Sequence, residues 1–396
     1  MAIGWHGMSA NKFDVLILAD PRFIGGTSSA IATDVQAFQA MGLRTGIHFV
    51  DAMDYFEPED TENPIFEDLF GLERVERILG DGPLEADIAF FHHPAIFQEP
   101  VGAPVRVKAR RAVIVTHQPL FWGDGALSID PLLIQRNIFR QFGVRADWAP
   151  ISGLCRRQYR TFAPLVRLTH MDWINTFDAD TWVPKRPKLT GPQLVVGRHG
   201  RPNRDKWPDM PAELAGSLPA DSETKIRVMG APADFFNEMG IATHDWDILA
   251  FNQEPVVDFL DSLDVFSYFH SALWTEAFGR TIAEAMLMEN RCILDPALKP
   301  TFGAHAIYCA PTEVAQVLDR LREDLPGARA AAAKARAYCL KEYSTRSIAA
   351  RYEQLLGDEG TVSRAGGTAV SPLTTLRKFI GFHRRRRQTR HRRAQS

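Results

Sequence analysis

Residues 12–50 read KFDVLILADPRFIGGTSSAIATDVQAFQAMGLRTGIHFV. The apolar run at 12–20 is typical of a buried parallel strand. A loop with two glycines follows it, then an amphipathic helix that ends near Gly42, then a second apolar run at 44–50. Strand, loop, helix and strand in this order form a βαβ unit, in which parallel strands share one sheet. The stretch therefore predicts an α/β fold.

The same alternation continues along most of the chain. Further strands are predicted at 86–94 and 111–119, and a second strand–helix series starts at residue 193. Between the two series, residues 175–192 are rich in proline and lysine and lack apolar periodicity, which indicates an interdomain linker. The second series predicts strands at 225–232, 247–252, 263–271, 292–296 and 306–311, and helices at 275–289, 313–324, 327–341 and 344–356.

These patterns divide the chain of 396 residues into two α/β domains and a tail. The predicted N-terminal domain covers residues 1–180 and the C-terminal domain covers residues 190–357. The last helix, 344–356, is a candidate to pack back on the N-terminal domain. The four cysteines lie far apart without a C-x-x-C pair, which argues against a disulfide framework and a zinc site and fits a reducing cytosol.

The tail, residues 361–396, carries a concentrated positive charge. It holds ten lysines and arginines and no acidic residue, whereas residues 1–360 hold 36 basic and 48 acidic residues, a formal charge of −12. Such a block is usually a disordered interaction tail. The apolar residues of 373–382 instead recur at spacings of three and four, which predicts a short amphipathic helix at a lipid surface. Both readings stay open. The sequence contains no run of about 18 apolar residues, so no membrane-spanning helix is expected.

Polar residues gather where the predicted strands of the first domain end. Gly25 and Gly26 lie between a strand and a helix, where backbone N–H groups can approach a phosphate; a plain tight turn is the alternative. His92, His93 and His117 lie at or just past two strand ends. A histidine there is a base, a hydrogen-bond donor to substrate or a structural residue. Their spacing does not support a metal site.

The loop after the first strand of the second domain is rich in cations. Its sequence, VGRHGRPNRDKWP, contains Arg198, Arg201, Arg204 and Lys206 but a single acid, Asp205. Forked donors and positive charge suit a diphosphate. A solvated basic loop is the alternative.

Two glutamates stand eight positions apart in WTEAFGRTIAEAM, residues 274–286. Glu276 falls in a loop after a predicted strand, but Glu284 is surrounded by apolar residues of a helix. An unpaired buried carboxylate is costly, so Glu284 needs a partner. A pair of carboxylates can bind sugar hydroxyls, a ribose diol or a metal.

Together these motifs resemble the GT-B retaining glycosyltransferases of family 4, also called glycosyl transferases group 1. The E-x7-E spacing in EAFGRTIAEAM matches their signature, PRFIGGTSSAI resembles their glycine loop, IAFFHHP their strand ending in His-x-Pro, and VVGRHGRPNRDKWP their Arg…Lys diphosphate site. The resemblance covers residues 12–357. It implies two Rossmann-like domains facing each other across a cleft.

The resemblance also implies roles for individual residues. Catalytic roles fall to His92, near the reacting centre, and Glu276, facing the donor sugar. Glu284 would bind the ribose hydroxyls. The diphosphate would be neutralised by Arg198 and Lys206 without a metal or cofactor. The remaining nucleotide-sugar-binding residues would be Gly25, Gly26, His117, Phe278 and Gly279.

The implied activity is the metal-independent, retaining transfer of a sugar from a nucleotide diphosphate sugar to a polysaccharide or glycolipid acceptor. The expected location is the cytoplasm, or the cytoplasmic face of a membrane that residues 373–393 would bind. A nucleotide-sugar epimerase and a glycoside phosphorylase of the same fold are alternatives. A nucleic-acid-binding protein and a degenerate transferase kept as a scaffold are others, although nucleic acid is not the expected partner.

One departure from the family concerns the residues after the second glutamate. The family commonly has a glycine and a proline there, where this chain has Glu289 and Arg291. Asn290 is expected to supply the left-handed turn. The segment 121–132 matches nothing in the family.

Overall fold

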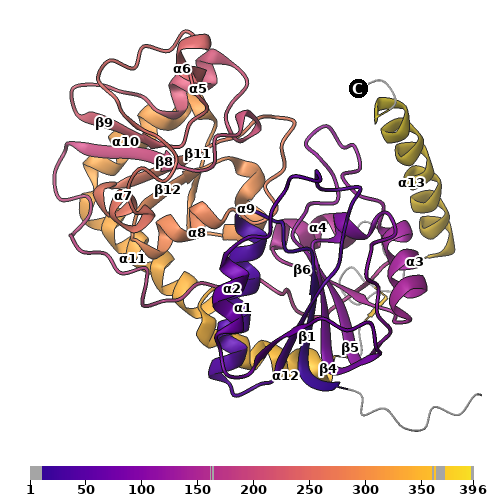
Figure 1. Ribbon diagram of the computed structural model, residues 1–396. Coiled ribbons are helices and arrows are strands. Elements are labelled where there is room, and N and C mark those ends of the chain that lie inside the picture. Colours follow the sequence, from indigo (N-terminus) through magenta and orange to yellow (C-terminus); the bar gives the residue numbers. More distant parts are fainter. Residues whose placement is uncertain (1–10, 161, 163–164, 359–360, 363–370, 394–396) are drawn as a thin grey trace, which may run out of the picture. The chain divides into compact units, whose positions relative to one another are not determined.

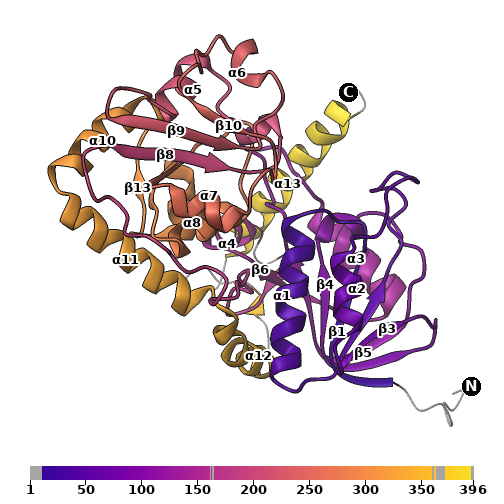
Figure 2. The same ribbon diagram turned by 60° about the vertical axis from the view of Figure 1, so that its left-hand side comes forward.

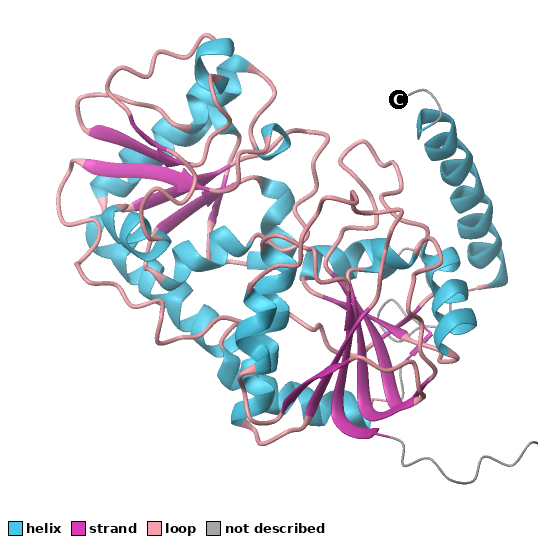
Figure 3. Cartoon of the chain, in the orientation of Figure 1, coloured by secondary structure: helices cyan, strands magenta, loops and turns pink. Residues whose placement is uncertain are grey.

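The structure is a computed structural model that describes residues 11–160, 162, 165–358, 361–362 and 371–393. Contacts divide the chain into two compact units. Unit 1 contains residues 1–121, 126–176 and 345–396, and unit 2 contains residues 122–125 and 177–344. Figure 3 shows that strands within each unit are surrounded by helices, as the βαβ pattern predicts.

Unit 1 is built on a sheet in the order β14-β7-β6-β5-β4-β1-β2-β3. All pairs are parallel except β14 with β7. Figure 1 shows α1 on one side of the strands and α3 on the other. The strands are β1 (Asn11–Ala19), β2 (Thr45–Phe49), β3 (Val75–Ile78), β4 (Leu84–His92), β5 (Val107–Thr116), β6 (Asp147–Pro150), β7 (Arg167–Leu168) and β14 (Thr361–Val362), and the main helices are α1 (Gly26–Ala40), α2 (Ile65–Phe70), α3 (Pro131–Phe142), α4 (Gly153–Arg160), α12 (Ile348–Gly357) and α13 (Pro372–Arg393).

Unit 2 has an all-parallel sheet in the order β10-β9-β8-β11-β12-β13. Figure 2 shows α8 and α11 on one side of it and α5 on the other. Its elements are β8 (Leu194–His199), α5 (Pro211–Ser217), β9 (Thr224–Met229), α6 (Phe235–Glu238), β10 (Asp247–Leu249), α7 (Val256–Ser262), β11 (Val265–Tyr268), α8 (Arg280–Leu287), β12 (Arg291–Leu294), α9 (Lys299–Phe302), β13 (Ile307–Tyr308), α10 (Val314–Glu323) and α11 (Leu325–Glu342).

Both sheets follow the doubly wound order, in which the strand sequence reverses next to the first strand. The reversal lies between β1 and β4 in unit 1 and between β8 and β11 in unit 2. In open α/β sheets, ligands bind beyond the carboxyl ends of the strands at such a switch point. The topology alone therefore marks one candidate edge in each unit.

The chain returns to unit 1 through α12. Arg351 Nη1 donates to the carbonyl of Ile174 (2.8 Å), and the Asp358 carboxylate accepts from the backbone N–H of His170 (2.7 Å). The C-terminal helix of the α/β series thus packs with the first unit.

Residues 177–192 of the predicted linker are a packed part of unit 2. Lys188 is only 3% exposed, and its Nζ donates to the carbonyl of Leu260 (3.0 Å). Arg186 pairs with Asp264 at 3.1 Å. Burial lowers the pKa of Lys188 to about 8, although Asp261 and Asp264 oppose the shift. The sequence suggested an interdomain linker because these contacts join residues 72 and 78 positions apart, which a local pattern does not show.

The turn after α8 corrects one expectation. Glu289, not Asn290, adopts the left-handed conformation, with φ of 58°. Asn290 instead donates its side-chain amide to the carbonyls of Leu260 (3.0 Å) and Leu263 (2.7 Å). The position where the family commonly has a glycine thus takes a left-handed backbone here, although a glutamate occupies it.

Candidate active site

The first candidate edge is the end of β4 in unit 1. His92 is 1% exposed, and its Nδ1 lies 2.9 Å from His117 Nε2. Burial, and then the neighbouring His93, lower the pKa of His92 to about 3. The imidazole is therefore neutral near pH 7. It can share a proton with His117, but it does not carry a fixed positive charge.

His93 directly follows His92 in the chain and has an unusual backbone conformation. Its φ is 62°, in the left-handed region that non-glycine residues rarely adopt. Its ring lies 4.1 Å from that of Phe23, and burial lowers its pKa to about 3. One neutral histidine thus ends β4, and a second directly follows it.

The glycine loop of unit 1 begins α1 as predicted from its sequence. Gly25 is the N-cap residue with φ of 103°, which a side chain would strain. Gly26 is the first helical residue, and Ser28 Oγ donates to the carbonyl of Phe23 (2.6 Å). This close turn fits both readings that the sequence left open, a tight βα turn and a phosphate approach.

The second candidate edge lies beyond β8 and β11 in unit 2, and Glu276 is its most strongly held side chain. Its Oε2 accepts hydrogen bonds from the Tyr268 hydroxyl (2.6 Å), Lys206 Nζ (3.1 Å) and Trp274 Nε1 (3.4 Å). None of the described residues donates a hydrogen bond to Oε1. Burial raises the pKa of Glu276, but Lys206 and the Tyr268 hydroxyl outweigh it and hold the value at about 2. The carboxylate is ionised and oriented.

Glu284 occupies the middle of α8. It is 9% exposed, and its carboxylate lies 3.4 Å from His199 Nε2 and 3.7 Å from Arg280 Nε. Burial raises its pKa, but His199 and Arg280 outweigh that effect and lower it overall. The buried carboxylate thus has the His199 imidazole and the Arg280 guanidinium as neighbours, the nearer of them at 3.4 Å. It keeps the capacity to accept short hydrogen bonds from a ligand.

Helix α8 starts later than the sequence pattern suggested. The predicted helix spanned 275–289, whereas α8 begins at Arg280 because Gly279 takes the N-cap position with φ of 87°. The Phe278 side chain packs against Tyr343 (5.3 Å between ring centroids) and Phe302 (6.2 Å). Phe278 therefore anchors the loop that carries Glu276 to the core of unit 2.

Arg198, which the resemblance implies as a diphosphate ligand, is a buried residue of β8. Its guanidinium is 3% exposed and lies between the rings of Trp207 (3.9 Å) and Tyr268 (4.4 Å). Its Nη atoms donate to the carbonyls of Phe269 and Lys206, each at 2.7 Å. The guanidinium is enclosed by these rings, and its role as a diphosphate ligand stays a prediction. Arg198 instead ties the Lys206 backbone to the end of β11.

The other cations of this loop also separate into different positions. Arg204 pairs with Glu238 on the surface. Lys206 is 19% exposed in its side chain and pairs with Glu276. Of the two diphosphate residues that the family resemblance implied, Lys206 is therefore the one placed beside a site carboxylate. No group of three or more His, Cys, Asp or Glu side chains that could hold a metal ion occurs within the described parts of the chain.

Three site residues were missed from the sequence: Tyr268, Trp274 and His199. Tyr268 ends an apolar strand and resembles core, and His199 ends β8 before the basic loop. Trp274 stands within the stretch that was singled out, two residues before Glu276. Its indole N–H, which needs a partner when partly buried, was the available signal.

Comparisons with known proteins support the fold. HepE from Anabaena, solved with UDP and glucose, matches at 13% identity with a TM-score of 0.59, over 88% of this chain and 99% of its own. A glycosyltransferase from Rickettsia africae matches at 11% identity with a TM-score of 0.57, over 88% and 99%. AviGT4, a glycosyltransferase of avilamycin A biosynthesis, matches at 15% identity with a TM-score of 0.50, over 88% and 98%.

These structures are glycosyltransferases of the GT-B class, so the predicted fold, with two Rossmann-like α/β domains, is confirmed. HepE has also been solved with UDP-glucose bound. No family model matches the sequence, and no curated protein matches it.

Proposed function

We propose that this protein is a retaining, metal-independent glycosyltransferase of family 4 that moves a sugar from a nucleotide diphosphate sugar to a polysaccharide or glycolipid acceptor. The observation that carries the proposal is the arrangement at the switch point of unit 2. There, Lys206 and Glu276 form an ion pair, and the buried Glu284 lies beside His199 at the end of β8. UDP and UDP-glucose in the HepE structures support the choice of a nucleotide-sugar donor.

The proposed roles follow from charge and accessibility. Glu284 accepts hydrogen bonds from the ribose hydroxyls. Glu276 offers Oε1 to the donor sugar while its Oε2 is held by Tyr268, Lys206 and Trp274. Lys206 stabilises the negative charge that develops on the departing diphosphate, which is the kind of electrostatic stabilisation that dominates such reactions. The backbone of Phe278 and Gly279 helps to hold the donor.

Unit 1 has its own proposed roles. His92 is the second catalytic residue, acting as a neutral imidazole supported by His117. Gly25 and Gly26 belong to the nucleotide-sugar-binding residues. We place the reaction in the cytoplasm, at the surface of a membrane. Among the described residues, no helix is both long and apolar enough to cross a bilayer.

Sugar transfer by the full chain is expected to continue in excess EDTA. The proposed diphosphate ligand is Lys206, whose charge does not depend on a metal. The measurement supplies UDP-, GDP-, ADP- and dTDP-sugars with oligosaccharide and membrane-extract acceptors, and determines the anomeric configuration of the product by NMR. We expect the donor's configuration to be kept and the rate to be unchanged by the chelator.

Two outcomes would contradict this proposal. Turnover that disappears with EDTA and returns with Mn²⁺ or Mg²⁺ would refute the metal-free mechanism. Isomerised donor without any transfer to acceptor would indicate an epimerase instead.

A further inference from the structure

The C-terminal helix α13 is docked on unit 1 by one of its faces. Phe382 is 2% exposed and meets the edge of Phe162 at 5.1 Å. Arg386 Nε lies 2.7 Å from Asp130 Oδ2. The other oxygen of Asp130 caps α3 by accepting from the N–H groups of Leu132 and Leu133. An arginine of the tail is thus fixed to a residue that starts a helix of the fold.

Two more contacts extend this docked face. Lys378 Nζ donates to the carbonyl of Arg160 at the end of α4 (3.4 Å), and the Arg385 guanidinium lies 4.7 Å from the centre of the Phe121 ring. The structure therefore shows residues 372–393 as a helix and not as the disordered tail that the sequence left open. Residues 363–370 and 394–396 of the tail lie outside the described residues.

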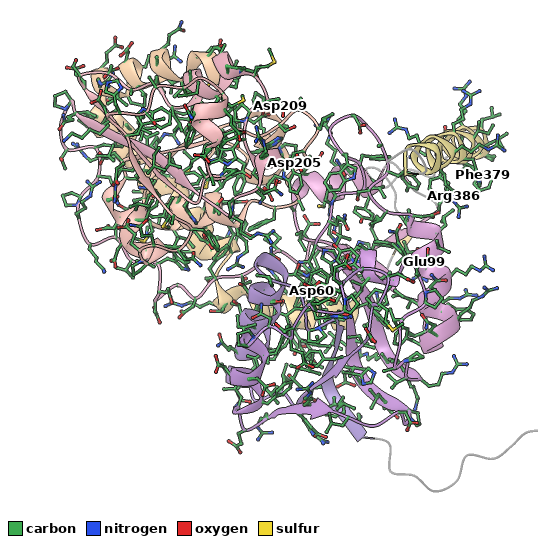
Figure 4. The ribbon with its side chains drawn as sticks, turned by 45° about the horizontal axis from the view of Figure 1, so that its top comes forward. Asp60, Glu99, Asp205, Asp209, Phe379 and Arg386 are labelled. Atoms are coloured by element: carbon green, nitrogen blue, oxygen red, sulfur yellow. The ribbon has the colours of Figure 1, made fainter. Side chains whose placement is uncertain are left out.

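The opposite face of α13 is apolar and exposed. Leu373, Leu376 and Ile380 are 71%, 54% and 47% exposed. At about 100° per residue they share an arc of roughly 60°, about 120° or more away from Phe382. Phe379, 41% exposed, borders this arc; Figure 4 labels it with Arg386 on the same helix. Elsewhere the exposed large apolar residues are scattered, whereas these four fall within eight positions.

Cations border this arc and continue it toward the C-terminal end of the helix. Arg377, Arg384 and Arg387 are exposed, and helical geometry places all three on the side away from Phe382. No acidic residue occurs between residues 361 and 396 to neutralise them. Long arginine side chains can extend their charged ends to headgroups while leucine and isoleucine enter the acyl boundary. The face is complementary to a negatively charged, partly apolar surface.

We propose that this outward face of α13 is a docking surface for an anionic lipid bilayer. The helix lies in the plane of the interface, with Leu373, Leu376 and Ile380 entering it and Arg377, Arg384 and Arg387 contacting anionic headgroups. Phe382 and Arg386 keep the helix fixed on unit 1, so the membrane holds unit 1 through a rigid connection. The inference rests on the proposed function for the membrane as the place of action.

Co-sedimentation of the full chain with vesicles tests this surface. The vesicles are phosphatidylcholine alone or with 30% phosphatidylserine. We expect binding to the anionic vesicles only. Each arginine near an anionic surface contributes about a factor of five, so the combined changes Arg377→Gln, Arg384→Gln and Arg387→Gln should lower the partition coefficient about 100-fold. The combined changes Leu373→Ser, Leu376→Ser and Ile380→Ser should lower it at least about tenfold.

Matched controls use equally exposed residues elsewhere. They combine Leu79→Ser, Val183→Ser and Met210→Ser in one variant, and Arg74→Gln, Lys225→Gln and Lys334→Gln in another. Both should bind like the wild type. Control-like binding by the α13 variants, or equal binding to neutral vesicles, would overturn the proposal. So would binding to DNA or RNA without binding to vesicles.

Thermal shift with the donor panel, run on the same variants, separates this inference from the proposed function. We expect donor-induced shifts to be unchanged in every variant. Vesicle binding by a wild-type protein that binds no donor would leave the docking surface standing and refute the transferase instead. Equal melting temperatures without ligand show that the variants are folded.

Discussion

Replacing Lys206 by methionine is expected to lower sugar transfer about 100- to 1000-fold, the usual effect of removing one group that stabilises developing negative charge. Methionine keeps most of the length of the side chain and removes its positive charge. The loss should appear mainly in kcat, because the charge on the diphosphate grows in the transition state. Initial rates at saturating and limiting donor concentrations measure it.

The matched control is Arg204→Met in the same loop. Arg204 is 57% exposed and pairs with Glu238, so its removal should change the rate less than about twofold. A Lys206→Met variant with wild-type kcat and an unchanged melting temperature would remove Lys206 from the mechanism. Equal losses in both variants would show that only the general charge of the loop matters.

The second large effect is acid destabilisation at the end of β4. The pKa values of His92 and His93 are each lowered from 6.5 to about 3, chiefly by burial. Below pH 6.5 the unfolded chain takes up protons that the folded protein does not, so stability falls as the pH falls from 6.5 towards 3. In that window each histidine can lower the free energy of unfolding by up to about 1.4 kcal/mol per pH unit.

The variant His93→Asn isolates this effect. Asparagine tolerates the left-handed backbone at φ of 62° but does not titrate. Guanidinium denaturation at pH 7, 6, 5 and 4 should show that the variant loses less stability than the wild type on acidification, by up to about 1.4 kcal/mol per pH unit. Parallel curves for the two proteins would mean that His93 is accessible to protons in the folded state.

The sequence was most informative where strands are buried on both faces. The predicted strands at 12–20, 86–94 and 263–271, and the series that starts at residue 193, overlap the four strands that border the two switch points. A central parallel strand needs apolar side chains on each side. The residues at the ends of those strands could be found with them. The short strands β3 and β6 and the two-residue β7 were missed, although β10, β12 and β13, which are equally short, overlap predicted strands.

The pairing of side chains within the site could not be predicted. Glu276 was recognised by its spacing from Glu284, but nothing in the sequence shows that Tyr268 donates to it. Arg198 was assigned to the diphosphate by the family resemblance, and it lies in β8. Its enclosure by Trp207 and Tyr268 depends on how the loop after β8 folds back on β11, which is a tertiary property.

The contacts of the tail could not be predicted from the sequence either. The density of arginine predicted disorder and the apolar spacing predicted a helix. The helix forms, and Phe382 and Arg386 find partners in unit 1 that lie more than 200 residues earlier in the sequence. Local pattern could indicate a helical segment but not the surface that receives it.

Calorimetric titration of the wild type and Glu284→Gln with UDP-, GDP-, ADP- and dTDP-sugars tests the central claim, that the edge of β8 and β11 binds a nucleotide diphosphate sugar. We expect one of these donors to bind the wild type. The variant should bind it about 10- to 150-fold more weakly, the loss expected for a hydrogen bond to a charged group. Wild-type affinity in a Glu284→Gln variant of unchanged stability would contradict the account, as would a wild type that binds none of the four.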